Sequence, residues 1–296
     1  MSKVLTLVAS SKEHPLTEAH NKEIIKIAAF YNVKPTCQPV WMKKGWVAEI
    51  GINESGGYSM MRHFREFLEK DKIDIFITGI EKRRKKILLA DMDSTIVEGE
   101  TLDDLAAHAG LKDQVSEITA RAMNGELDFH AALTERVALL KNLPAQALND
   151  TLDKMQINPG AATMIKTMRE TGTHCVLVSG GFTYFTGFVA GKLQFMNHHG
   201  NELEIENDVL TGRVIPPILD KNAKVEFLQH YMNMYILSAR DCMTIGDGAN
   251  DLPMLKMADF GVGYKAKATD AEELENLLIH GDFTAALYAQ GFGDED

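Results

Sequence analysis

Residues 87–95 read ILLADMDST, and this stretch decides the fold. Its first four residues form an apolar run that is typical of a buried strand. Asp91 and Asp93 follow directly, where such a strand ends and a loop begins. Open parallel sheets place their chemistry at the carboxyl ends of their strands. The stretch therefore predicts a parallel sheet with an acidic site at its edge.

A second stretch of the same kind lies far downstream. Residues 242–251 read CMTIGDGAND, an apolar run followed by Asp247 and Asp251. Carboxylates gathered in one cleft repel each other unless a hard cation neutralises them. The two stretches together predict a Mg²⁺ site that serves phosphoryl transfer.

Composition excludes several classes of protein. The chain has 296 residues and a formal net charge of −11, which argues against general nucleic-acid binding. It has no apolar run near the roughly 20 residues that span a bilayer, and its N-terminus lacks a cleavable signal pattern. Its cysteines, Cys37, Cys175 and Cys242, are odd in number and far apart. We expect a cytoplasmic, reduced protein with no membrane or nucleic-acid partner.

The first 80 residues predict a small separate domain. Their strands and helices are expected in the order βαββαβ, which is the ferredoxin-like arrangement. No cluster of acids, cysteines or histidines in this region indicates catalysis. The expected elements are strands at 4–9, 34–42, 46–52 and 73–80 and helices at 17–31 and 58–70.

Residues 81–86 read EKRRKK, a run of five consecutive bases. Such a run is compatible with a nucleic-acid or anionic-membrane surface. Because the rest of the chain is acidic, we interpret it as a solvated linker between two domains.

From residue 87 onward strands alternate with helices, which indicates a parallel sheet. The fold class is therefore α/β, with a Rossmann-like parallel core and an inserted helical cap, in addition to the N-terminal α+β domain. The core is expected at 87–102 and 155–296, and the cap at 103–154, with turns at Gly110, Asn124-Gly125 and Pro144. Core strands are expected at 87–90, 174–179, 242–246 and 260–263, and a β-hairpin at 202–206 with 211–215.

The residues that follow these strands suit phosphoryl transfer. Asp91 is placed to attack phosphorus, and Asp93 is placed to move protons as general acid and base. Ser179 and Gly180 precede a helix and offer a hydroxyl and backbone N–H groups to an anion. Lys224 would balance the charge that develops during transfer. Each has a plain alternative, a helix cap, a strand-to-helix turn or a solvated lysine, but their order along the chain favours a site.

In this order the motifs match those of the haloacid dehalogenase-like phosphohydrolases. The chain resembles this family over about residues 87–263, most closely its phosphoserine-hydrolysing branch. The resemblance implies that Asp91 is the nucleophile and Asp93 the general acid and base. It also implies Mg²⁺ held by Asp91, the main-chain carbonyl of Asp93 and Asp247. Asp251 would support this site by holding a coordinated water or the lysine.

The same resemblance implies which residues bind the phosphate and which contact the rest of the substrate. Ser179, Gly180 and Lys224 match the phosphate-binding residues of the family, and Asn250 is expected to contact substrate from the Gly-Asp-Gly loop. The implied substrate is a small molecule, O-phospho-L-serine, which carries an ammonium and a carboxylate besides its phosphate.

A zwitterionic substrate requires one acid and one base. Glu100 matches the family glutamate that meets the amino group. Arg136 lies on the apolar stripe of a predicted cap helix, where an arginine is costly unless it is paired. It is either a snorkelling side chain or, as the resemblance implies, the residue that binds the substrate carboxylate. Met123 and Phe129 match the apolar wall of the cap, which excludes water.

Other interpretations stay open on the sequence alone. A transferase that passes the phosphoryl group to an alcohol such as homoserine would share the same intermediate. A non-catalytic amino-acid sensor would have lost a key acid, and a fragment of an ion-pumping ATPase would carry membrane spans. The N-terminal domain is similar in predicted topology to ACT domains, which makes a homodimer through this domain possible.

Overall fold

The computed structural model describes residues 2–123 and 126–293, apart from the side chains of Met123, Lys221 and Ala268. The turn that the sequence predicts at Asn124-Gly125 lies outside the described residues. The boundaries that the sequence suggests for the N-terminal domain, the linker, the core and the cap stay a prediction. By contacts the chain forms two compact units, unit 1 with Met1–Leu89, Asn158–Cys175 and Leu228–Asp296, and unit 2 with Ala90–Ile157 and Val176–Phe227.

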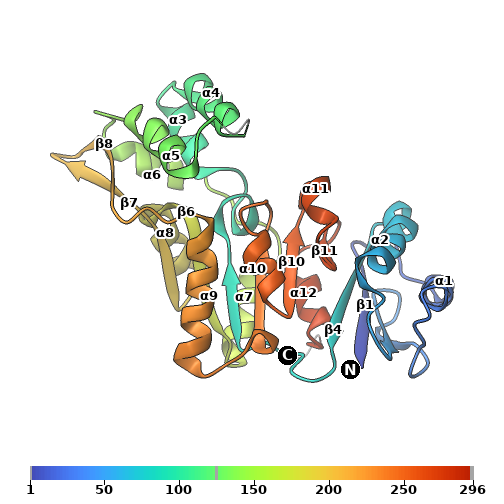
Figure 1. Ribbon diagram of the computed structural model, residues 1–296. Coiled ribbons are helices and arrows are strands. Elements are labelled where there is room, and N and C mark those ends of the chain that lie inside the picture. Colours follow the sequence, from blue (N-terminus) through green and yellow to red (C-terminus); the bar gives the residue numbers. More distant parts are fainter. Residues whose placement is uncertain (1, 124–125, 294–296) are drawn as a thin grey trace. The chain divides into compact units, whose positions relative to one another are not determined.

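The N-terminal part of unit 1 is a four-stranded antiparallel sheet with strand order β2-β3-β1-β4. This order and the βαββαβ sequence are those of the predicted ferredoxin-like fold. Helices α1 and α2 cover one face of this sheet, and α12 (Thr284–Ala289) lies against β1 and β4 (Figure 1). The elements are β1 (Lys3–Ala9), α1 (Glu18–Phe30), β2 (Val40–Lys43), β3 (Val47–Ile52), α2 (Gly57–Leu68) and β4 (Ile73–Gly79).

The second predicted strand, at 34–42, is largely wrong. Only Val40–Lys43 forms β2, and Pro35 makes no more than an isolated bridge to Ile52. Pro35 and Pro39 carry no backbone N–H, so this stretch cannot donate a continuous ladder of hydrogen bonds.

The basic stretch at 81–86 is exposed in part, since Lys82, Arg84 and Lys86 are exposed, but two of its bases are not solvated as the sequence predicts. Lys85 is 1% exposed, and its Nζ lies 2.6 Å from Asp259 Oδ2. Arg83 is half-buried and forms an ion pair with Glu49 of β3. Lys85 and Arg83 bind to acids of unit 1 because burial of a charge requires a partner.

A seven-stranded sheet, with order β11-β10-β9-β5-β6-β7-β8, forms the second layer of strands. Pairing is parallel for β9 with β10, β10 with β11 and β6 with β7, whereas β7 and β8 are antiparallel. The predicted core strands are all present, and the three-residue β11 was too short to predict. The strands are β5 (Ile87–Ala90), β6 (His174–Phe182), β7 (Asn197–Glu206), β8 (Val209–Ile215), β9 (Cys242–Gly246), β10 (Phe260–Tyr264) and β11 (Asn276–Leu278).

Buried polar contacts join the N-terminal sheet to the C-terminal residues of unit 1. The Asp74 carboxylate, on β4, accepts hydrogen bonds from the backbone N–H groups of residues 279–281. Ile77 N–H donates to Asn276 Oδ1 at 2.7 Å. Since buried polar groups cost free energy when unpaired, these contacts hold the two parts in one compact unit.

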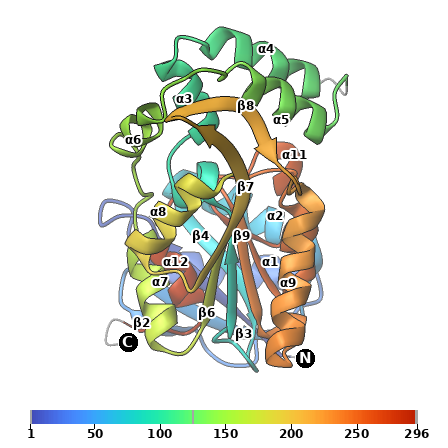
Figure 2. The ribbon, with the colours of Figure 1, turned by 90° about the vertical axis from the view of Figure 1, so that its left-hand side faces the viewer.

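Unit 2 contains the predicted helical cap and the predicted hairpin. The chain leaves and re-enters the cap beside an isolated bridge between Val97 and Ile157. The hairpin of β7 and β8 turns at Asn207 and Asp208, whose positive φ angles of 50° and 62° suit a tight hairpin turn, and β8 lies beside α5 (Figure 2). The helices are α3 (Thr101–His108), α4 (Lys112–Met123), α5 (Phe129–Ala138), α6 (Gln146–Leu152) and α8 (Thr183–Leu193).

The remaining helices are α7 (Ala161–Glu170), α9 (Lys221–Tyr235), α10 (Leu252–Met257) and α11 (Ala268–Ala271). No helix among the described residues has the length and apolarity to cross a membrane.

Candidate active site

Asp91 lies at the end of β5, where the sequence places the nucleophile. Its side chain is buried, and Lys224 Nζ lies 2.7 Å from its Oδ1. Lys224 comes from the first turns of α9 and is itself only 3% exposed. In a buried ion pair with this short separation, the positive charge of the lysine neutralises the negative charge of the carboxylate. The structure therefore brings the predicted lysine to the predicted nucleophile.

Asp93 is held by two hydrogen bonds on opposite oxygens. Its Oδ1 accepts from the backbone N–H of Thr101, and its Oδ2 accepts from Ser179 Oγ, both at 2.8 Å. Ser179 Oγ in turn accepts from the N–H of Gly181 at 2.8 Å. A Cβ at Gly181 would lie 2.7 Å from Asp93 Oδ2, so this position requires glycine. The predicted proton carrier and the predicted phosphate-binding serine are thus in direct contact.

The turn after Asp93 positions Glu100. Ser94 has φ of 55°, an uncommon conformation for a residue with a side chain. Its N–H donates to Gly99 O at 2.8 Å, which closes the turn. Its hydroxyl donates to Glu100 Oε1 at 2.7 Å. The strained turn therefore fixes the carboxylate that the sequence assigns to an amino group.

Arg136 projects from α5 and is half-buried. Burial lowers the pKa of its guanidinium, while the negative charges of Asp103 and Glu100 oppose that shift. Its Nε–H donates to Ala132 O at 3.3 Å. The base predicted for a carboxylate and the acid predicted for an ammonium therefore lie within electrostatic reach of each other.

Phe129, at the start of α5, meets the glycine after the phosphate serine. A Cβ on Gly180 would lie 3.2 Å from Phe129 Cζ, and the phenyl side chain is 38% exposed. Phe129 thus lies against Gly180, and its role in an apolar cap wall stays a prediction. The Met123 side chain lies outside the described residues.

The Gly-Asp-Gly loop of unit 1 is built around Asp251. Asp251 is fully buried, and its Oδ2 accepts from the N–H groups of Asp247 and Gly248 at 3.1 and 3.3 Å. A Cβ at Gly246 would lie 2.4 Å from the Asp251 carboxyl carbon, so glycine is required there. Asp247 is half-buried, whereas Asn250 is exposed in the loop before α10. Asp251 therefore organises the loop that presents Asp247.

Two residues of this region escaped the sequence interpretation. Thr101 and Gly181 both surround Asp93, one through its N–H and one through its lack of a side chain. Neither carries a sequence signal of its own, because a threonine at a helix start and a glycine after a strand are ordinary there.

Two buried thiols are chemically silent. Burial raises the pKa of Cys175 and of Cys242 to about 12, so both stay protonated and are weak nucleophiles. Both side chains are buried, so they act as small residues of the core.

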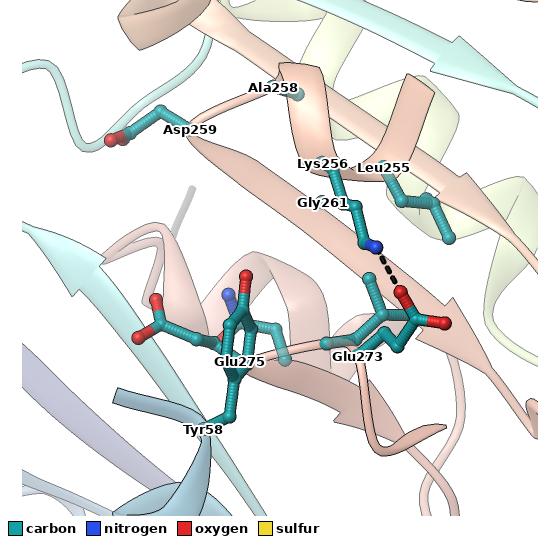
Figure 3. A pocket seen from close by; sticks show the side chains of 10 residues that line it. Tyr58, Leu255, Lys256, Ala258, Asp259, Gly261, Glu273 and Glu275 are labelled. Atoms are coloured by element: carbon teal, nitrogen blue, oxygen red, sulfur yellow. Dashed lines mark hydrogen bonds and ion pairs between the residues drawn. The ribbon is translucent and has the colours of Figure 1, made fainter. Parts of the chain in front are cut away.

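A small polar pocket of about 100 Å³ lies in unit 1 (Figure 3). Tyr58 of α2 lines it together with Lys256, Glu273 and Glu275, and Lys256 forms an ion pair with Glu273. None of the predicted site residues is among the described residues that line it.

The comparisons with known proteins agree with this geometry. The family model of the haloacid dehalogenase-like hydrolases matches residues 88–256. Phosphoserine phosphatase SerB2 of Mycobacterium tuberculosis is 38% identical over 224 residues, which are 75% of this chain and 55% of that protein. The chain thus spans little more than half the length of this relative.

Two solved structures are also similar. A haloacid dehalogenase family hydrolase of Salmonella enterica serovar Typhi has a TM-score of 0.84 and 26% identity, and the match covers 100% of this chain and 99% of that one. A phospho-aspartyl intermediate analogue of a phosphoserine phosphatase has a TM-score of 0.64 and 34% identity, and the match covers 69% of this chain and 98% of that one.

Proposed function

Because the chain belongs to the haloacid dehalogenase-like hydrolase family, we propose that it hydrolyses O-phospho-L-serine to L-serine and phosphate. The observation that supports this substrate is the pair Glu100 and Arg136, whose charges act on each other. An acid and a base at one place recognise the ammonium and the carboxylate of an amino acid. Relatives that are named phosphoserine phosphatase support the same substrate.

The reaction proceeds through an aspartyl-phosphate on Asp91. The Asp91 carboxylate attacks phosphorus while Asp93 gives a proton to the departing serine oxygen. Water then attacks the phosphorus of the intermediate, and the bond from phosphorus to the Asp91 oxygen breaks. Asp93 takes a proton from the attacking water. Lys224, already 2.7 Å from Asp91, holds the nucleophile in place and balances negative charge during both transfers.

The phosphate is bound next to these acids. Ser179 donates to Asp93 in the structure, and its hydroxyl is free to turn toward a phosphate oxygen instead. We propose that Gly180 offers its backbone N–H beside Ser179 and that Phe129, which lies against Gly180, excludes water when substrate is bound. Asn250, which is exposed, is proposed to contact the substrate from the Gly-Asp-Gly loop.

The donor set fits a hard divalent cation. Asp91, Asp247 and Asp251 each offer a carboxylate oxygen, the ligand type that Mg²⁺ prefers. The side-chain oxygens of Asp93 are engaged by Thr101 and Ser179, so Asp93 would contribute its main-chain carbonyl. Mg²⁺, when bound, would neutralise the charge of the phosphate and of these acids.

The test is a phosphate-release screen over phosphorylated small molecules, with and without Mg²⁺. We expect phosphoserine to be the preferred substrate and serine and phosphate to appear in equal amounts. Asp91→Asn should abolish both turnover and labelling of the protein by phosphate. Normal turnover in that variant would overturn the mechanism, and accumulation of phosphohomoserine with added homoserine would favour a transferase.

Further parts of the proposal concern the whole protein. We expect a cytoplasmic enzyme whose N-terminal domain is ACT-like and mediates a homodimer, which its ferredoxin-like topology permits. Sedimentation of the full chain, compared with a chain carrying a charge on the exposed edge strand β2, tests the dimer. A monomer at micromolar concentration would refute it.

A further inference from the structure

Thr101 carries a hydroxyl that the fold leaves without a partner. The residue is 3% exposed, and its Oγ1 has no hydrogen-bond partner among the described residues. A buried hydroxyl that bonds to nothing lowers stability, and in native proteins such groups are satisfied by water or by a ligand. The hydroxyl is therefore placed to bind something that the protein itself does not supply.

The hydroxyl and the general acid and base both lie next to Gly181. A Cβ at Gly181 would lie 2.7 Å from Asp93 Oδ2, 3.0 Å from Ser179 Oγ and 3.4 Å from Thr101 Oγ1. Three oxygens thus converge on one glycine, which alone leaves room for them. Thr101 is also fixed relative to Asp93, because its backbone N–H donates to Asp93 Oδ1.

Substrate binding would change the hydrogen bonds among these three oxygens. In the structure Ser179 Oγ donates to Asp93 Oδ2. When Ser179 turns to a phosphate oxygen, Asp93 Oδ2 loses that donor and is available to the proton it must move. The Thr101 hydroxyl, which has no partner among the described residues, then remains available near this carboxylate.

We propose that Thr101 Oγ1 and Asp93 together bind the water molecule that hydrolyses the aspartyl-phosphate, an inference that rests on the proposed function. In this step the water oxygen forms a bond to phosphorus and the bond from phosphorus to the Asp91 oxygen breaks. The Asp91 carboxylate keeps that electron pair, and the water proton moves to Asp93. Thr101 is a positioning residue for the water.

A second partner matters because a water held by one carboxylate can still rotate. Buried waters in proteins make about three hydrogen bonds. With the hydroxyl as its second partner, the water keeps a lone pair directed at phosphorus, and correct orientation is a large part of catalysis. The first half-reaction, attack by Asp91, needs no such water and should not depend on Thr101.

Thr101→Val tests the proposal because it removes the hydroxyl at nearly constant volume. In rapid-quench experiments with phosphoserine and Mg²⁺, we expect the rate of aspartyl-phosphate formation to stay within about twofold of wild type. Its hydrolysis should slow by about tenfold or more, because tenfold is the rate factor that corresponds to the loss of one hydrogen bond in the transition state. The intermediate should accumulate, and serine should appear in a burst before phosphate. Thr101→Ser should restore hydrolysis.

Thr151→Val is the matched control in the same unit. Thr151 is also a buried helix threonine, at 4% exposure, but its hydroxyl donates to Ala147 O at 2.8 Å. This variant should lower the melting temperature and leave both half-reactions unchanged. Thr101→Val should not lower the melting temperature, since it removes an unpaired group.

The outcomes separate this inference from the proposed function. If wild type forms no serine from phosphoserine, the proposed function fails. If wild type is active and Thr101→Val slows both half-reactions equally, or neither, the water-binding role of Thr101 is wrong. If the valine variant fails to fold, Thr101→Ala gives a second measurement of the rate of aspartyl-phosphate formation relative to the rate of its hydrolysis.

Discussion

Loss of Arg136 should separate substrates that carry a carboxylate from those that do not. The guanidinium is half-buried, and burial already lowers its pKa, so binding a substrate carboxylate removes little further water from it. A charge-assisted contact of this kind contributes about 2–3 kcal/mol. Arg136→Ala should therefore lower kcat/KM for phosphoserine by about 30- to 150-fold.

The assay compares phosphoserine with O-phosphoethanolamine, which keeps the ammonium and lacks the carboxylate. The variant should change kcat/KM for phosphoethanolamine by less than about threefold, because no contact to that substrate is lost. The phosphoserine loss should appear mainly in KM, since the carboxylate is bound equally in the ground and transition states.

Arg121→Ala is the control for a general weakening of the cap. Arg121 also belongs to the cap, but its Nη1 forms an ion pair with Glu135 at 2.8 Å and its side chain is 40% exposed. That variant should treat the two substrates alike. Equal losses for both substrates in Arg136→Ala would remove Arg136 from recognition of the carboxylate.

Three further outcomes are expected. Lys85→Met should lower the free energy of unfolding by about 2–4 kcal/mol, because it leaves Asp259 without its buried partner; denaturant melts check this, and an unchanged midpoint would contradict it. Hydrogen bonds from Lys82 and Ser238 outweigh the opposing effect of burial and lower the pKa of Asp241 to about 2, so its stabilisation is complete above about pH 4 and is lost as the pH falls toward 2. Asp241→Asn should abolish that part of the acid dependence, and an unaltered acid-unfolding curve would exclude it. Chelation by EDTA should abolish phosphate release, and excess Mg²⁺ should restore it; activity that survives chelation would argue against a metal.

The fold was predictable where the pattern of apolar residues agrees with the loop and turn residues that follow it. An apolar run followed by acids marks the end of β5 and of β9 because a buried strand and its exposed loop differ sharply in composition. The hairpin alternates, and its turn residues accept positive φ. The stretch at 34–42 misled because its apolar residues resemble a strand while Pro35 and Pro39 interrupt the hydrogen bonding.

The site was predictable as a set of residue types and much less as a set of contacts. Motif order placed Lys224 near Asp91, and the structure has them as an ion pair. The bond between Ser179 and Asp93 was not foreseen, because it joins residues 86 positions apart that each have another expected role. The role of Thr101 had no local signal, since an unpaired hydroxyl is visible only once the neighbouring residues are in place.

The basic stretch shows the same limit. A run of bases is solvated unless acids elsewhere in the chain approach it, and sequence alone does not reveal the approach. Lys85 is buried against Asp259, and the Asp74 carboxylate of β4 binds the backbone after β11. Within unit 1 the N-terminal sheet is therefore fastened to the strands that follow the Gly-Asp-Gly loop. Motion of the N-terminal sheet relative to those strands would break these buried hydrogen bonds, which costs free energy.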